Sequence, residues 1–288
     1  MLSVVMLSLS AAFASDNATD VVAIDNEIVI DEPLAVDENS QAVSADENVV
    51  TKDNFNNYFD STGSLLSNVT SDELVFSGDI SNVGVDNIVL NRSIKISGND
   101  AVLTNISIDV KSSDVVISGL TINQDKGEFG ISVSNASDVL IEDSTINFNA
   151  NAGINGYAIN ADFADNLKII NNIINYVGAT TGWEVNYAIR VSNSNNAIIS
   201  GNKIKAKIVS ADVGWAEVPA GSGNWVSSPI SGTIIVRDSN GPVLDSNDIY
   251  SSVVTAYGYD TMYVVDFSGT SGSVIVNNNI TSIGKDYI

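Results

Sequence analysis

The chain has 288 residues, with 12 Lys and Arg, 35 Asp and Glu, no His and no Cys, which gives a net charge of −23. These counts exclude disulfide scaffolds, Cys or His zinc sites, cysteine nucleophiles and Ser-His-Asp triads, because each needs a side chain that the sequence lacks. The negative charge argues against nucleic acid and anionic membranes as partners. Asn accounts for 35 residues, an excess that calls for a structural cause.

Residues 1–14 form an apolar stretch that ends in Ala12-Phe13-Ala14, a pattern typical of a signal peptidase site. The stretch is too short to span a membrane, so we predict a signal peptide and a mature chain that is secreted or displayed at the cell surface. A buried core helix is the alternative. Residues 15–50 carry ten acidic residues and no Lys or Arg. We predict a disordered acidic linker there, because such a segment buries too little apolar area to offset its ordering entropy.

Residues 52–98 are expected to close the N-terminal end of the domain that follows. Thr51 or Asp53 can cap a short helix that turns its aromatic residues inward. The inward residues of this cap would be Phe55, Phe59, Tyr58 and Leu66. Residues 74–78 and 94–98 are predicted to be the opening strands.

Six similar segments follow, at 113–123, 137–147, 165–175, 195–205, 240–250 and 272–282. Their alignment gives two apolar columns and a polar column between them. The first column contains Ile117, Ile141, Ile169, Ile199, Leu244 and Ile275. The second contains Ile122, Ile146, Ile174, Ile204, Ile249 and Ile280. The column between them contains Leu120, Ser144, Asn172, Asn202, Asn247 and Asn278.

A further strand-like segment precedes each later unit and also alternates apolar with polar residues. Its apolar pairs are Ile131/Val133, Ile159/Ala161, Ile189/Val191, Ile234/Val236 and Val265/Phe267, and Ile108/Val110 fits if its turn is one residue shorter. Apolar residues alternate with a period of two within each unit, whereas a helical solenoid would show a period of 3.6. Equivalent residues of successive units also align, which disfavours a β-sandwich. In a parallel β-helix each unit is one coil, and equivalent residues stack about 4.8 Å apart.

We therefore predict an all-β fold, a parallel β-helix with three sheets and an N-terminal helix and strand cap, over residues 51–288. The Asn column is expected at a sharp bend, where Asn tolerates a positive φ and its amide can bond the amide of the next coil. Because residues 280–288 follow the last strand without a cap, we expect the sequence to be truncated or to belong to a longer parent.

The repeats resemble those of the right-handed parallel β-helices of the pectate-lyase-like superfamily. Together with the leader and the acidic linker, the Asn-rich coils are similar to the adhesin-like surface proteins of archaeal methanogens. The resemblance covers about residues 52–288. It implies that the Ile131-type segments form the first sheet, the Ile117-type segments the second and the Ile122-type residues the third, with the Asn column between the second and third.

Coil lengths differ because the links from the third strand to the next first strand differ, so every insertion projects from one edge. The links, at 123–130, 147–158, 175–188, 205–233 and 250–264, hold 12 of the 19 aromatic residues that follow the leader. Flat amphipathic rings can stack on sugars, or they can pack onto the first sheet. Residues 206–229 are predicted to form a hairpin flap. The predicted ligand-binding residues are Tyr157, Tyr176, Trp183, Tyr187, Trp215, Trp225, Tyr257 and Tyr259.

The resemblance also implies an enzymatic alternative, because lyases and galacturonases of the superfamily place their catalytic residues on outward positions of the first sheet. The candidates at such positions are Asp162, Arg190, Arg237 and Asp266, beside Asn160. Asp162 and Asp266 are expected about 14 Å apart by strand spacing, too far to share one metal ion. Ion pairs across an exposed sheet explain these charges equally well. We expect no metal site and no cofactor.

Lys203, Lys205 and Lys207 alternate and so share one face of a strand, which is more typical of a solvated face than of an anion site. The sequence is most consistent with a monomeric, adhesin-like surface protein that binds glycans or proteins of neighbouring cells. A structural spacer without a ligand and a polysaccharide lyase or glycoside hydrolase are the alternatives. Exposed aromatic residues around a groove would favour the adhesin, and buried ones the spacer.

Overall fold

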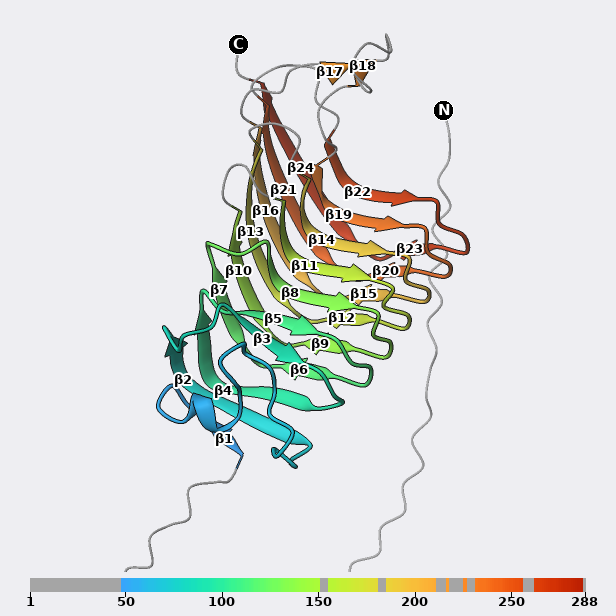
Figure 1. Cartoon of the computed structure of the whole chain (residues 1–288). Coiled ribbons are helices and arrows are strands. Elements are labelled where there is room, and N and C mark those ends of the chain that lie inside the picture. The colour runs from blue at the N-terminus through green and yellow to red at the C-terminus, as the bar shows by residue number, and fades with distance from the viewer. Residues whose placement is uncertain are drawn as a thin grey trace, which may run out of the picture. The chain divides into compact units, whose positions relative to one another are not determined.

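The computed structural model describes residues 48–150, 155–180, 185–210, 216–217, 225–226, 231–255 and 262–286. These residues form a β-helix of parallel strands, wound coil upon coil around a core of hydrophobic side chains (Figure 1). The predicted signal peptide, and the linker up to residue 47, lie outside the described residues. Within the described part, no helix is long and apolar enough to cross a membrane.

Each coil from β5 onward contributes one strand to each of three sheets. The first sheet consists, in spatial order, of β22 (Met262–Ser268), β19 (Ser231–Arg237), β14 (Asn186–Ser192), β11 (Gly156–Asp162), β8 (Phe129–Ser134), β5 (Ser107–Val110) and β3 (Asn87–Leu90). The second consists of β23 (Val274–Val276), β20 (Val243–Asp245), β15 (Ile198–Ser200), β12 (Lys168–Ile170), β9 (Leu140–Glu142) and β6 (Val116–Ser118). The third consists of β7 (Thr121–Gln124), β10 (Thr145–Asn149), β13 (Ile173–Thr180), β16 (Lys203–Ser210), β21 (Asp248–Thr255) and β24 (Asn279–Asp286).

The second and third sheets are joined at their N-terminal end. There β4 (Lys95–Thr104) pairs with β6 through its first residues and with β7 through its last. Its other neighbour, β2 (Glu73–Ser81), pairs in turn with β1 (Val49–Val50). The predicted opening strands at 74–78 and 94–98 are thus confirmed as parts of β2 and β4.

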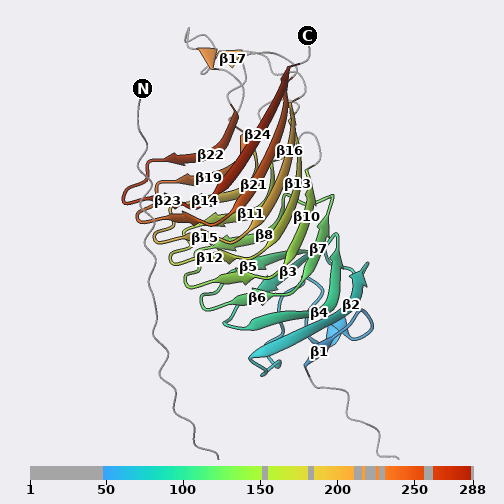
Figure 2. The same ribbon diagram turned by 180° about the vertical axis from the view of Figure 1, so that it is seen from behind.

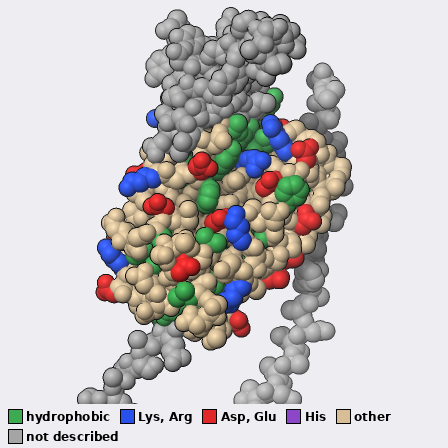
Figure 3. All heavy atoms as spheres, viewed as in Figure 1, with side chains coloured by type: hydrophobic (Ala, Val, Ile, Leu, Met, Phe, Trp, Pro, Cys, Tyr) green, Lys and Arg blue, Asp and Glu red, His purple; other side chains and the backbone are tan. Residues whose placement is uncertain are grey.

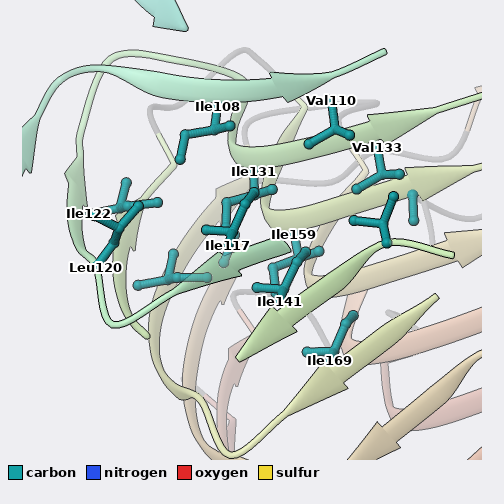
Figure 4. Packing of buried hydrophobic residues seen from close by; sticks show 14 of the residues in the cluster. Ile108, Val110, Ile117, Leu120, Ile122, Ile131, Val133, Ile141, Ile159 and Ile169 are labelled. Atoms are coloured by element: carbon teal, nitrogen blue, oxygen red, sulfur yellow. The ribbon is translucent and has the colours of Figure 1, made fainter. Parts of the chain in front are cut away.

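The predicted apolar columns are confirmed as stacks of residues in register. Ile117 pairs with Ile141, which pairs with Ile169, and all three are fully buried (Figure 4). Ile108 lies opposite Ile131, as expected if its turn is one residue shorter. Branched apolar residues at every second position suit a strand, and identical neighbours above and below exclude water from the ladder.

The predicted Asn column is confirmed as a buried hydrogen-bonded stack between the second and third sheets. We call Asn172, Asn202, Asn247 and Asn278 the inner Asn ladder. Each of its first three members donates a side-chain N–H to the Oδ1 of the next, over 2.9–3.1 Å. The expectation that these Asn residues carry a positive φ is wrong. The preceding residue does so instead, as in Asn171 (56°) and Gly201 (67°), which frees the ladder side chains to point inward.

The turn between the first and second sheets contains a regularity that the sequence analysis missed. In each coil from β8 onward, two residues three positions apart have a positive φ. The pairs are Asn135/Asp138, Phe163/Asn166, Asn193/Asn196, Asp238/Gly241 and Gly269/Gly272. Asn, Asp and Gly adopt this conformation at low cost, whereas an aromatic residue such as Phe163 does so with strain.

The N-terminal cap is present but is built differently from the prediction. Its helix is a single 3₁₀ turn, η1 (Phe55–Asn57), and Asn54 rather than Thr51 or Asp53 occupies the cap position. The Asn54 Oδ1 accepts the Thr51 N–H over 2.7 Å, and its Nδ2 donates to the Val49 carbonyl over 2.8 Å. Phe55 and Phe59 stack with ring centroids 4.8 Å apart and are buried as expected.

Candidate functional site

The first correction concerns where the link aromatics lie. The sequence analysis placed them in links, but the strands extend further than the repeats suggested, since β13 continues to Thr180 and β11 begins at Gly156. Backbone pairing with the strands of neighbouring coils continues past the apolar repeat and so lengthens these strands. Seven of the twelve aromatic residues therefore belong to the first and third sheets. They are Phe129, Phe148, Tyr157, Tyr176, Tyr187, Tyr250 and Tyr263.

Tyr176 is a core residue and not a ligand-stacking one, so its prediction as a binding residue is wrong. Its side chain is 1% exposed, and its ring stacks on Phe148 at a centroid distance of 5.9 Å. Its hydroxyl donates to the Gly156 carbonyl over 2.7 Å, which ties the third sheet to the start of the first across the interior. Burial raises the pKa of Tyr176 well above its usual range.

Tyr187 is buried as well, although it lies on a different sheet. The ring is 1% exposed and sits against Gly232 of the next strand, where an added Cβ would lie 3.0 Å from the Tyr187 Cε1 and collide with the Tyr263 backbone oxygen. Burial raises the pKa of the Tyr187 hydroxyl, and the charge of Arg237 opposes this shift. With no free ring face, Tyr187 cannot stack on a sugar in this conformation, and the prediction of a binding role for it is corrected.

Tyr157 remains partly exposed, but its ring already has a partner. The Arg190 guanidinium carbon lies 5.9 Å from the ring centroid, and the Arg190 Nη1 donates to the Asn160 Oδ1 over 2.9 Å. A cation near an aromatic face gains about 0.5–1 kcal/mol at such a site. Desolvation raises the pKa of Tyr157, although the nearby Arg190 charge lowers it. The structure thus brings one predicted binding residue and one predicted catalytic residue together.

The other catalytic candidates share this outer face, yet each is held by its own neighbour. The Asp162 carboxylate accepts a side-chain N–H from Asn193 over 2.9 Å. Arg237 and Asp266 form an ion pair over 3.4 Å. Acidic and basic side chains are interspersed on the face shown in Figure 3. Arg190 and Asp266 are separated in the register by Ile235, so these groups do not converge on one reacting centre.

The remaining predicted binding residues cannot be placed. Trp183, Trp215, Tyr257 and Tyr259 lie outside the described residues, as does the side chain of Trp225. The predicted flap does contain an antiparallel pair, in which β17 (Ala216–Glu217) pairs with β18 (Trp225–Val226).

A groove of about 830 Å³ runs over the outer face of the third sheet, whose strands lie side by side in Figure 2. Its lining comes from β4, β7, β10, β13, β16 and β21 and from the residues that follow β4 and β7. Strand residues form most of the groove, whereas the sequence analysis predicted binding by aromatic residues of the links. We call it the third-sheet groove.

The floor of the groove carries a second row of asparagines. We call Asn123, Asn147 and Asn175 the outer Asn row. They pair in register, and each follows a buried isoleucine, so their side chains face outward. Asn147 donates to the Asn123 Oδ1 over 2.7 Å, and Asn175 donates to the Asn147 Oδ1 over 2.8 Å.

The outer row was visible in the sequence, since three of the aligned segments end in Asn at the same position. The sequence analysis attributed the Asn excess to the column at the bend and gave these three residues no role. Lys205 and Tyr250 continue the same register on β16 and β21, and Tyr250 is 37% exposed.

Comparisons with known proteins leave both the fold and the function to be argued from the residues of this chain. No family model and no curated protein match the chain. Among solved structures, the chain is similar to the catalytic domain of a GH87 alpha-1,3-glucanase in complex with tetrasaccharides, with 10% identity over 79% of this chain and 69% of that one. The TM-score is 0.29, so the functional argument rests on the residues of this chain.

Proposed function

We propose that this chain is a non-catalytic, adhesin-like protein that is exported and that recognises a glycan in the third-sheet groove. The observation that supports this proposal most is the chemistry of the groove, which combines amide groups, hydroxyl groups and one exposed ring, Tyr250. Glycan sites in proteins use such a mixture, because sugars present hydroxyls on their edges and C–H groups on their faces.

The distribution of carboxylates supports binding over catalysis. Glycoside hydrolysis generally uses two carboxyl groups that flank the scissile bond. Among the described lining residues of the groove, Asp125 is the one carboxylate. The catalytic candidates of the first sheet are engaged in the contacts described above, and the described residues contain no cluster of three metal-binding acidic side chains.

A structural spacer is the second candidate, and the burial of Phe148, Tyr176 and Tyr187 favours it. These buried rings stabilise the coils and leave no open ring face on which a sugar could stack. The two proposals differ in one respect, since a spacer needs no exposed ring at a fixed place in a groove.

Binding of the full chain to a glycan array and to whole cells tests the proposal, with Tyr250→Ala as the groove variant. Tyr263→Ala is the matched control, because Tyr263 is 39% exposed and lies on the first sheet, whereas Tyr250 is 37% exposed. We expect Tyr250→Ala to weaken binding at least fivefold and Tyr263→Ala to leave it unchanged. Binding of the wild-type chain to no glycan and no cell would refute recognition and leave the spacer.

A further inference from the structure

We infer that the ligand of the third-sheet groove is a linear glycan that lies along the axis of the β-helix, one sugar unit per coil, and carries an anionic group above Lys205 and Lys207. This inference rests on the proposed function and specifies its ligand. It follows from the repeat of the groove floor, the unused hydrogen-bonding capacity of the outer Asn row and the placement of two lysines.

The floor of the groove repeats once per coil. Asn123, Asn147, Asn175, Lys205 and Tyr250 lie in one register across β7, β10, β13, β16 and β21. Four strand spacings of about 4.8 Å give a floor about 19 Å long. An extended chain of pyranose rings advances by a similar distance per ring. A linear ligand that runs across the strands therefore meets an equivalent polar group at each step.

The outer Asn row retains groups that can bind such a ligand. An Asn side chain has two N–H donors and a carbonyl oxygen with two lone pairs. Asn147 uses one donor toward Asn123 and one lone pair toward Asn175. Within the described part of the chain, one donor and one lone pair remain on Asn147, and its neighbours fix the orientation of the amide in advance. Two adjacent sugar hydroxyls can fill this pair, because each hydroxyl both donates and accepts.

The lysines of β16 differ in their surroundings. Lys203 has Asp248 as its neighbour in the register. Lys205 lies between Asn175 and Tyr250 instead, and Lys207 lies between Val177 and Ser252. Both side chains are exposed and line the groove, and neither forms an ion pair with a residue that the structure describes.

Lys205 and Lys207 place two positive charges in the groove of a chain whose net charge is −23. The sequence analysis interpreted these lysines as part of a solvated strand face, and their exposure agrees with this. Their place in the groove also puts them beside any ligand that binds there. A carboxylate or sulfate on the ligand would neutralise them. Added salt would weaken this attraction, because it screens the charges. Asp125 lies three strands away at the β7 end and would repel such a group, so the charge of the ligand has one preferred position.

Calorimetric titration of the full chain with two matched series of oligosaccharides tests the inference. The first series is neutral, β-1,4-linked gluco-oligosaccharides of one to six units. The second is the same series oxidised to the carboxylate at C6. We expect affinity to rise with length up to about five units, and the acidic series to bind about tenfold more tightly at low salt. The preference should shrink as salt is added.

Two sets of variants assign the effect to residues. Lys205→Gln with Lys207→Gln should abolish the preference for the acidic series, whereas Lys168→Gln, at an exposed lysine on the second sheet, should leave that preference intact. Asn147→Ala should weaken both series severalfold. Its control is Asn279→Ala, because the Asn279 side-chain amide donates to the Asp248 carboxylate on the same sheet but lies outside the groove. Unchanged thermal unfolding would confirm that each variant is folded.

Equal affinity for a single sugar and for five units would overturn the linear arrangement, and equal affinity for both series would overturn the anionic group. Either result leaves carbohydrate recognition standing. Tighter binding of an oligoglutamate peptide than of any oligosaccharide would overturn the inference in favour of an acidic peptide. If no oligosaccharide binds at any length, the proposed function fails together with it.

Discussion

Two rows of asparagine cross the coils of this protein, one inside a turn and the other on a surface. In the inner Asn ladder, Asn202 is 1% exposed. The Ile169 carbonyl, the Ser200 carbonyl and the Asn247 Oδ1 lie 2.8–3.1 Å from its Nδ2 and share its two N–H groups, and its Oδ1 accepts the Asn172 backbone N–H. In the outer Asn row, Asn147 uses one donor and one acceptor.

The same residue type at the same coil spacing thus has two different roles. A buried amide must satisfy its own groups and those of the bend around it, because an unpaired polar group inside a protein is costly. An amide on an open face can leave groups to water, and a ligand can later replace that water. The inner ladder therefore holds the fold, and the outer row is available for binding.

The largest expected effect comes from the inner ladder. Asn202→Ala leaves the Ile169 carbonyl and the Asn172 N–H without their partner in the interior, at about 1–3 kcal/mol for each group. We expect the free energy of unfolding to fall by about 3 kcal/mol or more, measured by chemical denaturation followed by circular dichroism. A loss below about 1 kcal/mol would show that the ladder is not a main stabilising feature.

A buried pair of tyrosines sharpens the comparison, because one hydroxyl has a partner and the other does not. The Tyr176 hydroxyl donates to Gly156, whereas the buried Tyr187 hydroxyl has no hydrogen-bond partner among the described residues. Tyr176→Phe should destabilise the fold by about 1 kcal/mol at neutral pH, and Tyr187→Phe should change stability little. Equal losses in the two variants would contradict the assignment.

The same two residues predict a pH dependence. Burial raises their pKa above the usual 10.0, so the folded state keeps each proton after the unfolded state has lost it. The contribution of these two tyrosines to stability should thus be constant below pH 10 and fall as the pH rises above it. The double variant Tyr176→Phe with Tyr187→Phe should flatten this decline in denaturation curves recorded from pH 8 to pH 11.

The turn position of Phe163 tests whether the backbone conformation or the side-chain amide contributes more to stability. Phe163 has a φ of 53° and is 57% exposed, while Asn135 and Asn193 occupy the equivalent place in the neighbouring coils. Asn tolerates this region better than an aromatic residue does, so Phe163→Asn should stabilise the protein by about 1 kcal/mol. Phe163→Ala keeps the strain and serves as the control, with the thermal midpoint as the measurement. A Phe163→Asn variant no more stable than the control would point away from strain.

The smallest expected effect comes from the outer row. Asn147→Ala removes two amide bonds at a site that water can reach, so we expect the free energy of unfolding to change by about 0.5 kcal/mol or less. Combined with the loss of oligosaccharide affinity predicted above, this would separate binding from stability. A loss comparable to that of Asn202→Ala would remove the distinction between the two rows.

The sequence by itself determined the register of the coils. Like residues recur at matching positions, as at Ile117, Ile141 and Ile169, and a parallel stack is the arrangement that buries them all together. The inner Asn ladder followed for the same reason, because its position within each unit is fixed by its distance from the apolar columns. These features depend on local spacing, which a repeat makes explicit.

The tertiary structure decided which side chains remain open to a ligand. Whether Tyr176 reaches the interior depends on how far β13 continues past its apolar repeat and on the Gly156 carbonyl that meets the hydroxyl from another sheet. The third-sheet groove likewise arises from strands of several coils whose outward residues align only after the chain has wound. The burial of a side chain and the shape of a groove depend on many neighbours that are distant in sequence. The spacing of residues along the chain does not specify them.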